Sequence, residues 1–87
     1  QSLKYLGISL AKLEDYEGAL KAFDKLLRIN PTDPSILNYR GVILGKVGKF
    51  REAIRVFDEI LRLYPELAGA KKKLEILKSL EREELHY

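Results

Sequence analysis

Residues 3–31, LKYLGISLAKLEDYEGALKAFDKLLRINP, decide the fold, because their pattern returns 34 positions later as LNYRGVILGKVGKFREAIRVFDEILRLYP in residues 37–65. Self-similarity at a fixed period indicates a chain built from stacked supersecondary units. The identical residues that recur in register include glycine, alanine, phenylalanine and proline: Leu3/Leu37, Tyr5/Tyr39, Gly7/Gly41, Leu10/Leu44, Lys12/Lys46, Ala19/Ala53, Phe23/Phe57, Asp24/Asp58, Leu27/Leu61, Arg28/Arg62 and Pro31/Pro65.

Each copy contains two amphipathic helices. In the first copy, the apolar run over residues 16–29 predicts the second helix of the pair. In the second copy, residues 34–47 are predicted to form the first helix of the pair, with Gly48 at the turn that follows. A proline closes each copy, since proline cannot donate the helical hydrogen bond. The first helix, over residues 2–13, carries leucines at helical spacing: Leu3, Leu6, Leu10 and Leu13.

The recurring residues match a known family motif. The first copy reads Leu3, Leu6-Gly7, Leu10, Ala19, Phe23 and Pro31, and the second reads Leu37, Arg40-Gly41, Leu44, Ala53, Phe57 and Pro65. This order resembles the tetratricopeptide repeat (TPR), W-x2-L-G-x2-Y, then A-x3-F, then P. Leucine stands at the Trp and Tyr positions, and Arg40 replaces the motif's leucine. The resemblance covers about residues 1–67 and implies an all-α, TPR-type α-solenoid of antiparallel helix pairs.

The repeat also divides the chain. We expect residues 1–87 to form a single TPR domain, with repeat 1 at about 1–33 and repeat 2 at about 34–67. A final helix over about 67–85 carries Glu75 at the position of the two recurring glycines, so it does not begin a third repeat. It resembles the family's terminal capping helix, which covers the last apolar face. The prediction is therefore five helices.

The recurring mid-helix glycines predict close packing. Gly7 and Gly41 each cost about 1 kcal/mol of helix stability relative to alanine. The cost recurs in register, so we expect the missing Cβ to let the partner helix approach closely, with Ala19 and Ala53 across that contact. Phenylalanine would then fill the space between neighbouring pairs.

Catalytic and cofactor chemistry finds no support in the residue pattern. The chain has no cysteine, its one histidine is His86 beside the C-terminus, and its glycines are isolated. The carboxylates do not converge on a metal site or on a nucleophile. We therefore expect a protein that is not an enzyme and holds no cofactor or metal. The absence of cysteine, of an apolar span and of a signal-peptide pattern favours a cytoplasmic protein outside the membrane.

Nucleic acid is a competing partner class. The run Lys71-Lys72-Lys73 and the pair Arg51 and Arg55 could contact phosphates. Acidic residues lie close to both clusters, and no base-reading motif accompanies them. Solvated helix faces explain these charges better.

The distribution of charge points instead to a protein partner. Neither residues 1–13 nor residues 34–47 contain an acid, and they carry Lys4, Lys12, Arg40 and Lys46. In TPR arrays the first helix of each pair lines a concave groove, so the resemblance implies a basic groove for an acidic peptide with apolar anchors. The predicted partner-binding residues are Lys4, Tyr5, Ile8, Lys12, Asn38, Tyr39, Val42, Lys46 and Lys73.

Two alternatives stay open for these residues. The tyrosines could be buried between helices, and the lysines could be ordinary solubilising charge. The carboxylate clamp of TPR co-chaperones is not reproduced. Its five positions hold one match and one approximation, Lys4 and Lys73, whereas the other three hold Ile8, Tyr39 and Gly69.

Self-assembly is the alternative function. Two repeats and a cap are fewer than such stacks usually need, and the first helix has an outer face that an earlier helix would normally cover. The chain could thus be part of a longer array, or could form a homodimer through this edge. Ile76 and Leu80 on the last helix offer a second apolar contact.

Overall fold

The computed structural model describes residues 2–85, which contain five α-helices and no β-strand. The predicted all-α fold of five helices is confirmed. His86, the one histidine of the sequence, lies outside the described residues. The helices are α1 (Leu3–Lys12), α2 (Tyr16–Ile29), α3 (Pro34–Lys46), α4 (Phe50–Leu63) and α5 (Ala68–Leu85).

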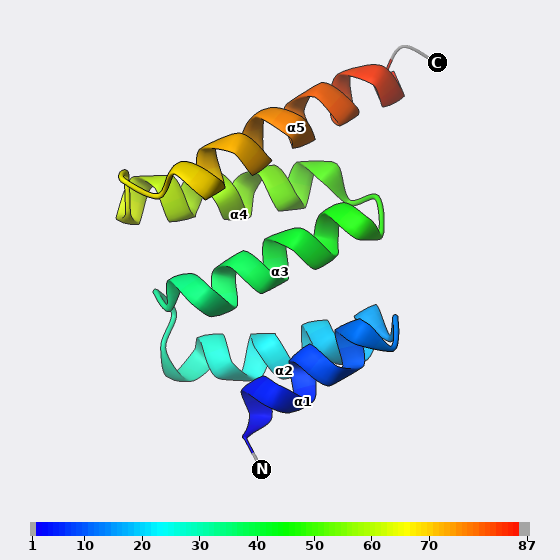
Figure 1. Cartoon of the computed structure of the whole chain (residues 1–87), viewed down its shortest axis with the longest axis vertical. Helices are drawn as coiled ribbons and strands as arrows, with labels where there is room; N and C mark the ends of the chain where they lie inside the picture. Colours follow the sequence, from blue (N-terminus) through cyan, green and yellow to red (C-terminus); the bar gives the residue numbers. More distant parts are fainter. Residues whose placement is uncertain (1, 86–87) are drawn as a thin grey trace.

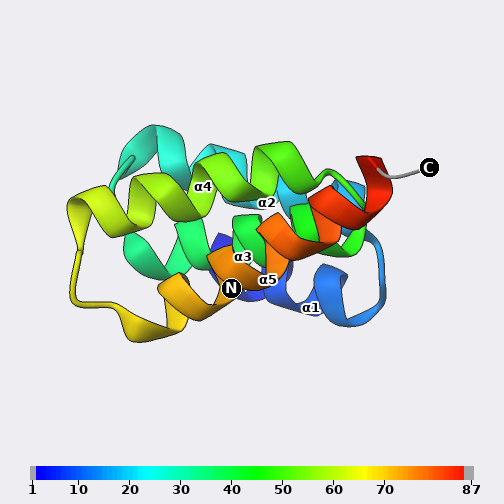
Figure 2. The same cartoon turned by 90° about the horizontal axis from the view of Figure 1, so that it is seen from above.

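The helices form an antiparallel stack in two layers (Figures 1 and 2). Helices α1 and α2 make one pair, α3 and α4 make the next, and α5 packs on α4. Seen from above, α1, α3 and α5 lie in one layer, and α2 and α4 lie in the other (Figure 2). We call the surface formed by α1, α3 and α5 the odd-helix face.

Side chains at the helix starts fix where three of the helices begin. Ser2, Asp15 and Asp33 cap α1, α2 and α3, and each accepts a backbone N–H of the first turn at 3.0–3.1 Å. Pro34 follows the Asp33 cap at the first helical position, where its missing N–H has no cost. The cap position of α4 is Lys49, whose side chain makes no such hydrogen bond.

The turn inside each pair requires one residue with a left-handed backbone. Gly48 fills this position in the second pair, with φ of 86°, and Glu14 fills the equivalent position in the first, with φ of 63°. A residue with a Cβ is about 1–2 kcal/mol less stable in this conformation, whereas glycine adopts it freely. Both turns therefore contain one left-handed residue, but only the turn of the second pair has glycine there, which adopts this conformation without strain.

The core consists of two clusters. The first joins the two helix pairs, and its buried members are Ala19, Phe23, Ile36 and Ile43. The second unites α3, α4 and α5, and its buried members are Leu37, Leu44, Ala53, Val56, Phe57, Ile60, Ala70, Leu74 and Leu77.

The recurring glycines make room for phenylalanine. A Cβ on Gly7 would lie 2.7 Å from the Phe23 ring, and a Cβ on Gly41 would lie 2.7 Å from the Phe57 ring. Close approach is thus present, and the atoms nearest to the missing Cβ belong to an aromatic ring, while Ala19 and Ala53 are fully buried in the same core. The rings lie within their own helix pair, since a flat ring fits where the partner helix has no side chain. Phe23 also reaches the next pair, where it stacks on Tyr39 with 5.4 Å between ring centroids.

Helix α1 is less covered than its leucine pattern predicts. Leu6 is 49% exposed and Leu13 is 78% exposed, and the only fully buried residue of α1 is Gly7. The equivalent face of α3 packs on the preceding pair through Ile36 and Ile43. No described element lies on that face of α1, so half of its predicted apolar stripe meets solvent.

Helix α5 covers the second pair as α3 covers the first. Its buried Ala70 and Leu77 stand in the register of Ile36 and Ile43 on α3. Where α3 has Leu37, Gly41 and Leu44 against its partner helix, α5 shows charged and exposed residues: Lys71, Glu75 and Lys78. One side of α5 therefore completes the core, and the side that would meet a partner helix is polar, as in a capping helix.

Candidate functional site

The crevice between α3 and α5 contains two hollows. The first hollow has a volume of about 240 Å³ and is lined mainly by apolar side chains, with Phe57 below and the exposed Lys46 at its edge. Its other lining residues are Gly41, Val42, Gly45, Lys73, Ile76, Leu77 and Leu80. The second hollow, of about 290 Å³, is lined by Pro34, Ser35, Asn38, Ile60, Leu67, Gly69, Ala70 and Lys73.

Lys73 stands between the hollows and lines both. Its Nζ donates a hydrogen bond to Oδ1 of Asn38 across the crevice at 3.0 Å, and it lies 6.0 Å from the centroid of the Phe57 ring. The ammonium group is thus held by a neutral amide and the face of an aromatic ring. The sequence singled out both Asn38 and Lys73 but did not predict that they would meet.

The predicted residues of α1 occupy the equivalent register on the first pair. Lys4 and Ile8 are half-buried, with Ile8 packed against the first core cluster, whereas Lys12 is exposed in the last turn of the helix. Tyr5, Ile8 and Lys12 on α1 stand in register with Tyr39, Val42 and Lys46 on α3. The face therefore repeats an aromatic, an aliphatic and a basic residue on two helices.

The two tyrosines, although equivalent in sequence, differ in their surroundings. Tyr39 is half-buried and stacked on Phe23, whereas Tyr5 is 69% exposed. The difference arises because α3 has a helix pair before it and α1 has none among the described residues. Tyr39 thus has a structural role, whereas the Tyr5 side chain meets solvent, and neither tyrosine lines the two hollows.

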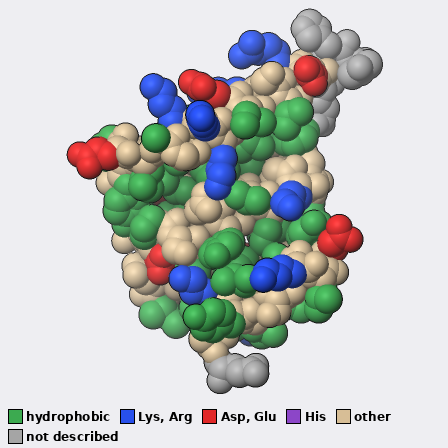
Figure 3. Space-filling view, in the orientation of Figure 1, with side chains coloured by type: hydrophobic (Ala, Val, Ile, Leu, Met, Phe, Trp, Pro, Cys, Tyr) green, Lys and Arg blue, Asp and Glu red, His purple; other side chains and the backbone are tan. Residues whose placement is uncertain are grey.

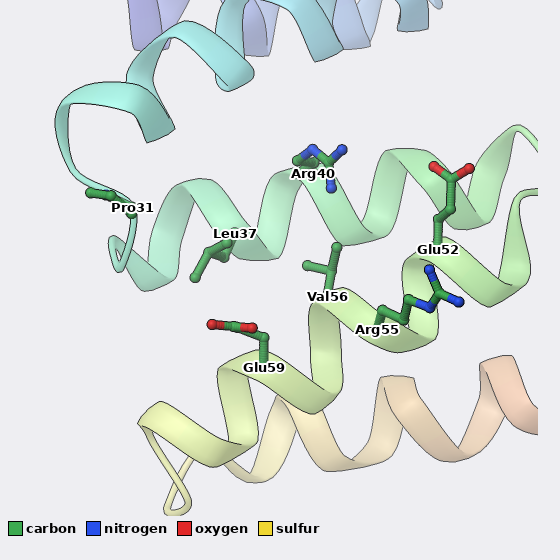
Figure 4. A pocket seen from close by; sticks show the side chains of 7 residues that line it. All are labelled: Pro31, Leu37, Arg40, Glu52, Arg55, Val56 and Glu59. Carbon is green, nitrogen blue, oxygen red and sulfur yellow. The ribbon is translucent and has the colours of Figure 1, made fainter.

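Arg40 does not belong to the predicted groove. Its Nε lies 2.8 Å from the Asp24 carboxylate of α2, so its charge is directed between the layers and partly neutralised. Figure 4 shows it at a hollow of about 420 Å³ between α3 and α4. That hollow contains both signs of charge, since Glu52, Arg55 and Glu59 also line it. The expectation that Arg40 contributes to a basic groove was wrong, because its position on α3 directs the side chain toward Asp24 of α2.

The remaining cations of the odd-helix face have no carboxylate partner among the side chains that the structure describes. The ion pairs recorded there join Arg40 to Asp24, Arg51 to Glu81 and Arg62 to Glu59. None involves the four predicted lysines: Lys4, Lys12, Lys46 and Lys73. Figure 3 looks onto this face, where Lys and Arg are spread among apolar side chains and the acids lie nearer its margins.

The lining residues that the sequence did not predict lie on α3 and α5, on α4 (Phe57 and Ile60) and just before α5 (Leu67). Gly45 and Leu77 line the first hollow, together with Ile76 and Leu80, which the sequence indicated only as an apolar contact. Gly45 gave a weak signal, since it occupies the position of Ala11 in the first copy. Among the side chains that the structure describes, no group of three potential metal ligands comes together. None of the described helices is long and apolar enough to cross a membrane.

The comparisons with known proteins agree with this arrangement. Two tetratricopeptide-repeat family models match residues 1–33 and residues 22–55 and together cover more than half of the chain. The chain belongs to the tetratricopeptide-repeat family. The second match begins inside α2, so it spans the contact between the two helix pairs rather than one pair. The two matches differ in where the repeat begins along the chain, but they describe the same stack of helices.

Solved structures share the TPR fold. Among the 32 matching chains is one titled "MamA RS-1 ArsTM double mutant", with a TM-score of 0.84 and 29% sequence identity. The match covers 92% of this chain and 45% of that one, so this TPR chain spans less than half of the structure it resembles. No curated protein sequence matches. TPR domains bind other proteins or peptides, and the chain is a module of this kind.

Proposed function

We propose that the odd-helix face binds an acidic segment of a partner protein and that the chain acts by binding rather than by catalysis. One observation carries the proposal: Lys4, Lys12, Lys46 and Lys73 on this face have no carboxylate partner among the described side chains. Helices α1 and α3, which carry three of these lysines, contain no Asp or Glu that could neutralise them. A positive field of this kind attracts an acidic ligand and raises its association rate. Apolar surface beside the lysines supplies the remaining affinity.

Charge reversal at two equivalent positions tests the proposal. Peptides would first be selected for binding from a display library of random short sequences, and their Kd measured by fluorescence anisotropy. Replacing Lys12→Glu and Lys46→Glu together, both exposed, should weaken binding of the selected peptides about tenfold or more. The Kd of the parent should also rise with salt, because exposed charges are screened.

Two lysines in the other layer provide the matched control. Lys21 and Lys25 on α2 are exposed and have no ion pair among the described side chains, so Lys21→Glu with Lys25→Glu changes the net charge equally. This variant should keep the Kd within about twofold of the parent. Equal losses in both variants would mean that total charge, and not the odd-helix face, governs binding.

Self-association is a second candidate function, favoured by the exposed apolar residues at the N-terminal edge. Leu6, Leu13 and Ile29 are 49%, 78% and 81% exposed. The association should be weak, because α1 has Ser2 and Ser9 where α3 has the isoleucines that pack on the preceding pair. The same edge could receive a preceding helix pair in a longer array.

Sedimentation velocity over a wide concentration range decides between the two apolar contacts. If the edge self-associates, Leu6→Ser with Leu13→Ser should abolish the dimer, while Ile76→Ser with Leu80→Ser should leave it intact. The reverse result would place the contact on α5. A parent that remains a monomer throughout excludes self-association.

A further inference from the structure

The half-buried Lys73 lies in the crevice without a carboxylate partner among the described side chains. Its described neighbours are the Asn38 carbonyl oxygen at 3.0 Å and the Phe57 ring at 6.0 Å, and no carboxylate is among them. A charge removed from water is costly unless a counter-charge or sufficient hydrogen bonds compensate it. The Asn38 amide nitrogen adds two more donors beside the ammonium group. Together these groups favour a carboxylate at this point.

Apolar space lies on both sides of that point. Helices α3 and α5 run in the same direction (Figure 1), and the two hollows follow one another between them. On both helices, the residues that line the first hollow come about seven positions after those that line the second. At 1.5 Å per residue, the two hollows are therefore ~10 Å apart along the helix axes. Each hollow has room for one aliphatic side chain, at about 290 Å³ and about 240 Å³.

This separation selects a helical occupant. Seven residues of α-helix span ~10.5 Å and bring residues i and i+7 onto the same face, with i+3 and i+4 between them. In an extended chain ~10 Å corresponds to three residues, whose side chains point to opposite faces, so a β-strand could not fill both hollows. An amphipathic helix lying along the crevice could fill both.

We propose that the acidic partner segment is an amphipathic helix with aliphatic residues at i and i+7 and Asp or Glu at i+3 or i+4. The aliphatic side chains occupy the two hollows, and the carboxylate binds Lys73 and Asn38 between them. A further acid beyond the residue in the first hollow meets Lys46 at its edge. This inference rests on the proposed function and specifies the ligand of the same face.

Peptide selection gives the first test, because the library contains no bias toward any spacing. Peptides selected on the parent protein should share two aliphatic residues seven positions apart with an acid three or four positions after the first. Replacing that acid by Gln should weaken binding about tenfold or more, as expected for a lost charge-assisted hydrogen bond. Selected peptides with alternating acids and no such spacing would overturn the helical assignment.

Two variants test the crevice without disturbing the core. A Cβ on Gly69 would meet nothing within 4 Å, so Gly69→Leu should fold normally and fill the second hollow. We expect it to weaken the selected peptides about tenfold or more, and Lys73→Met should abolish their preference for Glu over Gln. Ser79→Leu provides the control, since Ser79 is exposed on α5 and lines neither hollow.

The results separate this inference from the function on which it rests. If selected peptides are acidic and sensitive to the Lys12→Glu and Lys46→Glu pair, yet unaffected by Gly69→Leu and Lys73→Met, the crevice assignment fails and the basic face stands. If the peptides respond to neither set of changes, both proposals fail. Circular dichroism of each variant confirms that losses of binding are not losses of fold.

Discussion

At the residue scale, the turns inside the two helix pairs differ at one demanding position. Glu14 adopts a left-handed backbone with φ of 63°, and its equivalent Gly48 does so with φ of 86°. Glu14→Gly should therefore raise the free energy of unfolding by about 0.5–1 kcal/mol. This is the backbone strain that the substitution removes, minus the entropic cost of ordering a glycine, which is more flexible in the unfolded chain. Urea midpoints at a fixed protein concentration measure the change.

The reverse substitution supplies the control. No atom lies within 4 Å of the Cβ position of Gly48, so Gly48→Ala has no steric clash and only a conformational cost. It should lower the free energy of unfolding by about 1 kcal/mol. If Glu14→Gly and Gly48→Ala shift the urea midpoint in the same direction, the left-handed conformation is not what limits these turns.

Gly41 tests whether helix packing outweighs helix propensity. An alanine Cβ there would lie 2.7 Å from the Phe57 ring and 3.1 Å from Val56, both buried. We expect Gly41→Ala to destabilise the protein by about 1–3 kcal/mol, although alanine is the better helix former. The control is Gly69→Ala, which has open space around it and should be neutral or stabilising. Equal stability of both variants in urea would contradict the close packing of Gly41 on Phe57.

At the scale of the element, α4 lacks a device that α2 has. Asp15 caps α2 by accepting the Gly18 N–H at 3.1 Å, while Lys49 occupies the equivalent position before α4 and makes no capping hydrogen bond. Lys49→Asp should stabilise the protein by about 1 kcal/mol, because it satisfies a free N–H and places negative charge at a helix N-terminus. Asp15→Lys should cost a similar amount. A thermal melt that shows no gain for Lys49→Asp would mean that the cap geometry of the first pair is not shared.

Helix α5 is required by the core of the second pair. Leu74 is 7% exposed and belongs to the cluster that contains Phe57 and Ile60. Leu74→Ala should lower the free energy of unfolding by about 2–5 kcal/mol through the cavity it leaves. Deletion of residues 67–87 should go further and give an aggregated or molten product that binds a hydrophobic dye. The exposed Lys72→Ala on the same helix is the control and should stay within about 0.5 kcal/mol of the parent.

At the scale of the whole molecule, stability should fall toward α1. Helix α1 buries only Gly7 fully, whereas α3 buries Ile36, Leu37, Gly41, Ile43 and Leu44. In a stack whose units contact only their neighbours, the least covered terminal helix opens first. Native-state hydrogen exchange should therefore give the α1 amides the lowest protection and those of α3 and α4 the highest. Protection as high in α1 as in α4 would show that the stack unfolds as one unit.

The sequence alone determined the number, order and pairing of the helices, because the period, the prolines and the recurring glycines are local signals repeated in register. It also indicated the basic, acid-free character of α1 and α3, since charge can be counted without coordinates. Only the tertiary structure showed that Phe23 and Phe57 lie against the glycines, that Arg40 turns to Asp24, and that Lys73 joins Asn38 between two hollows. These are contacts between different helices. Their geometry depends on how the helices are packed and rotated against one another, which the repeat register of a sequence does not contain.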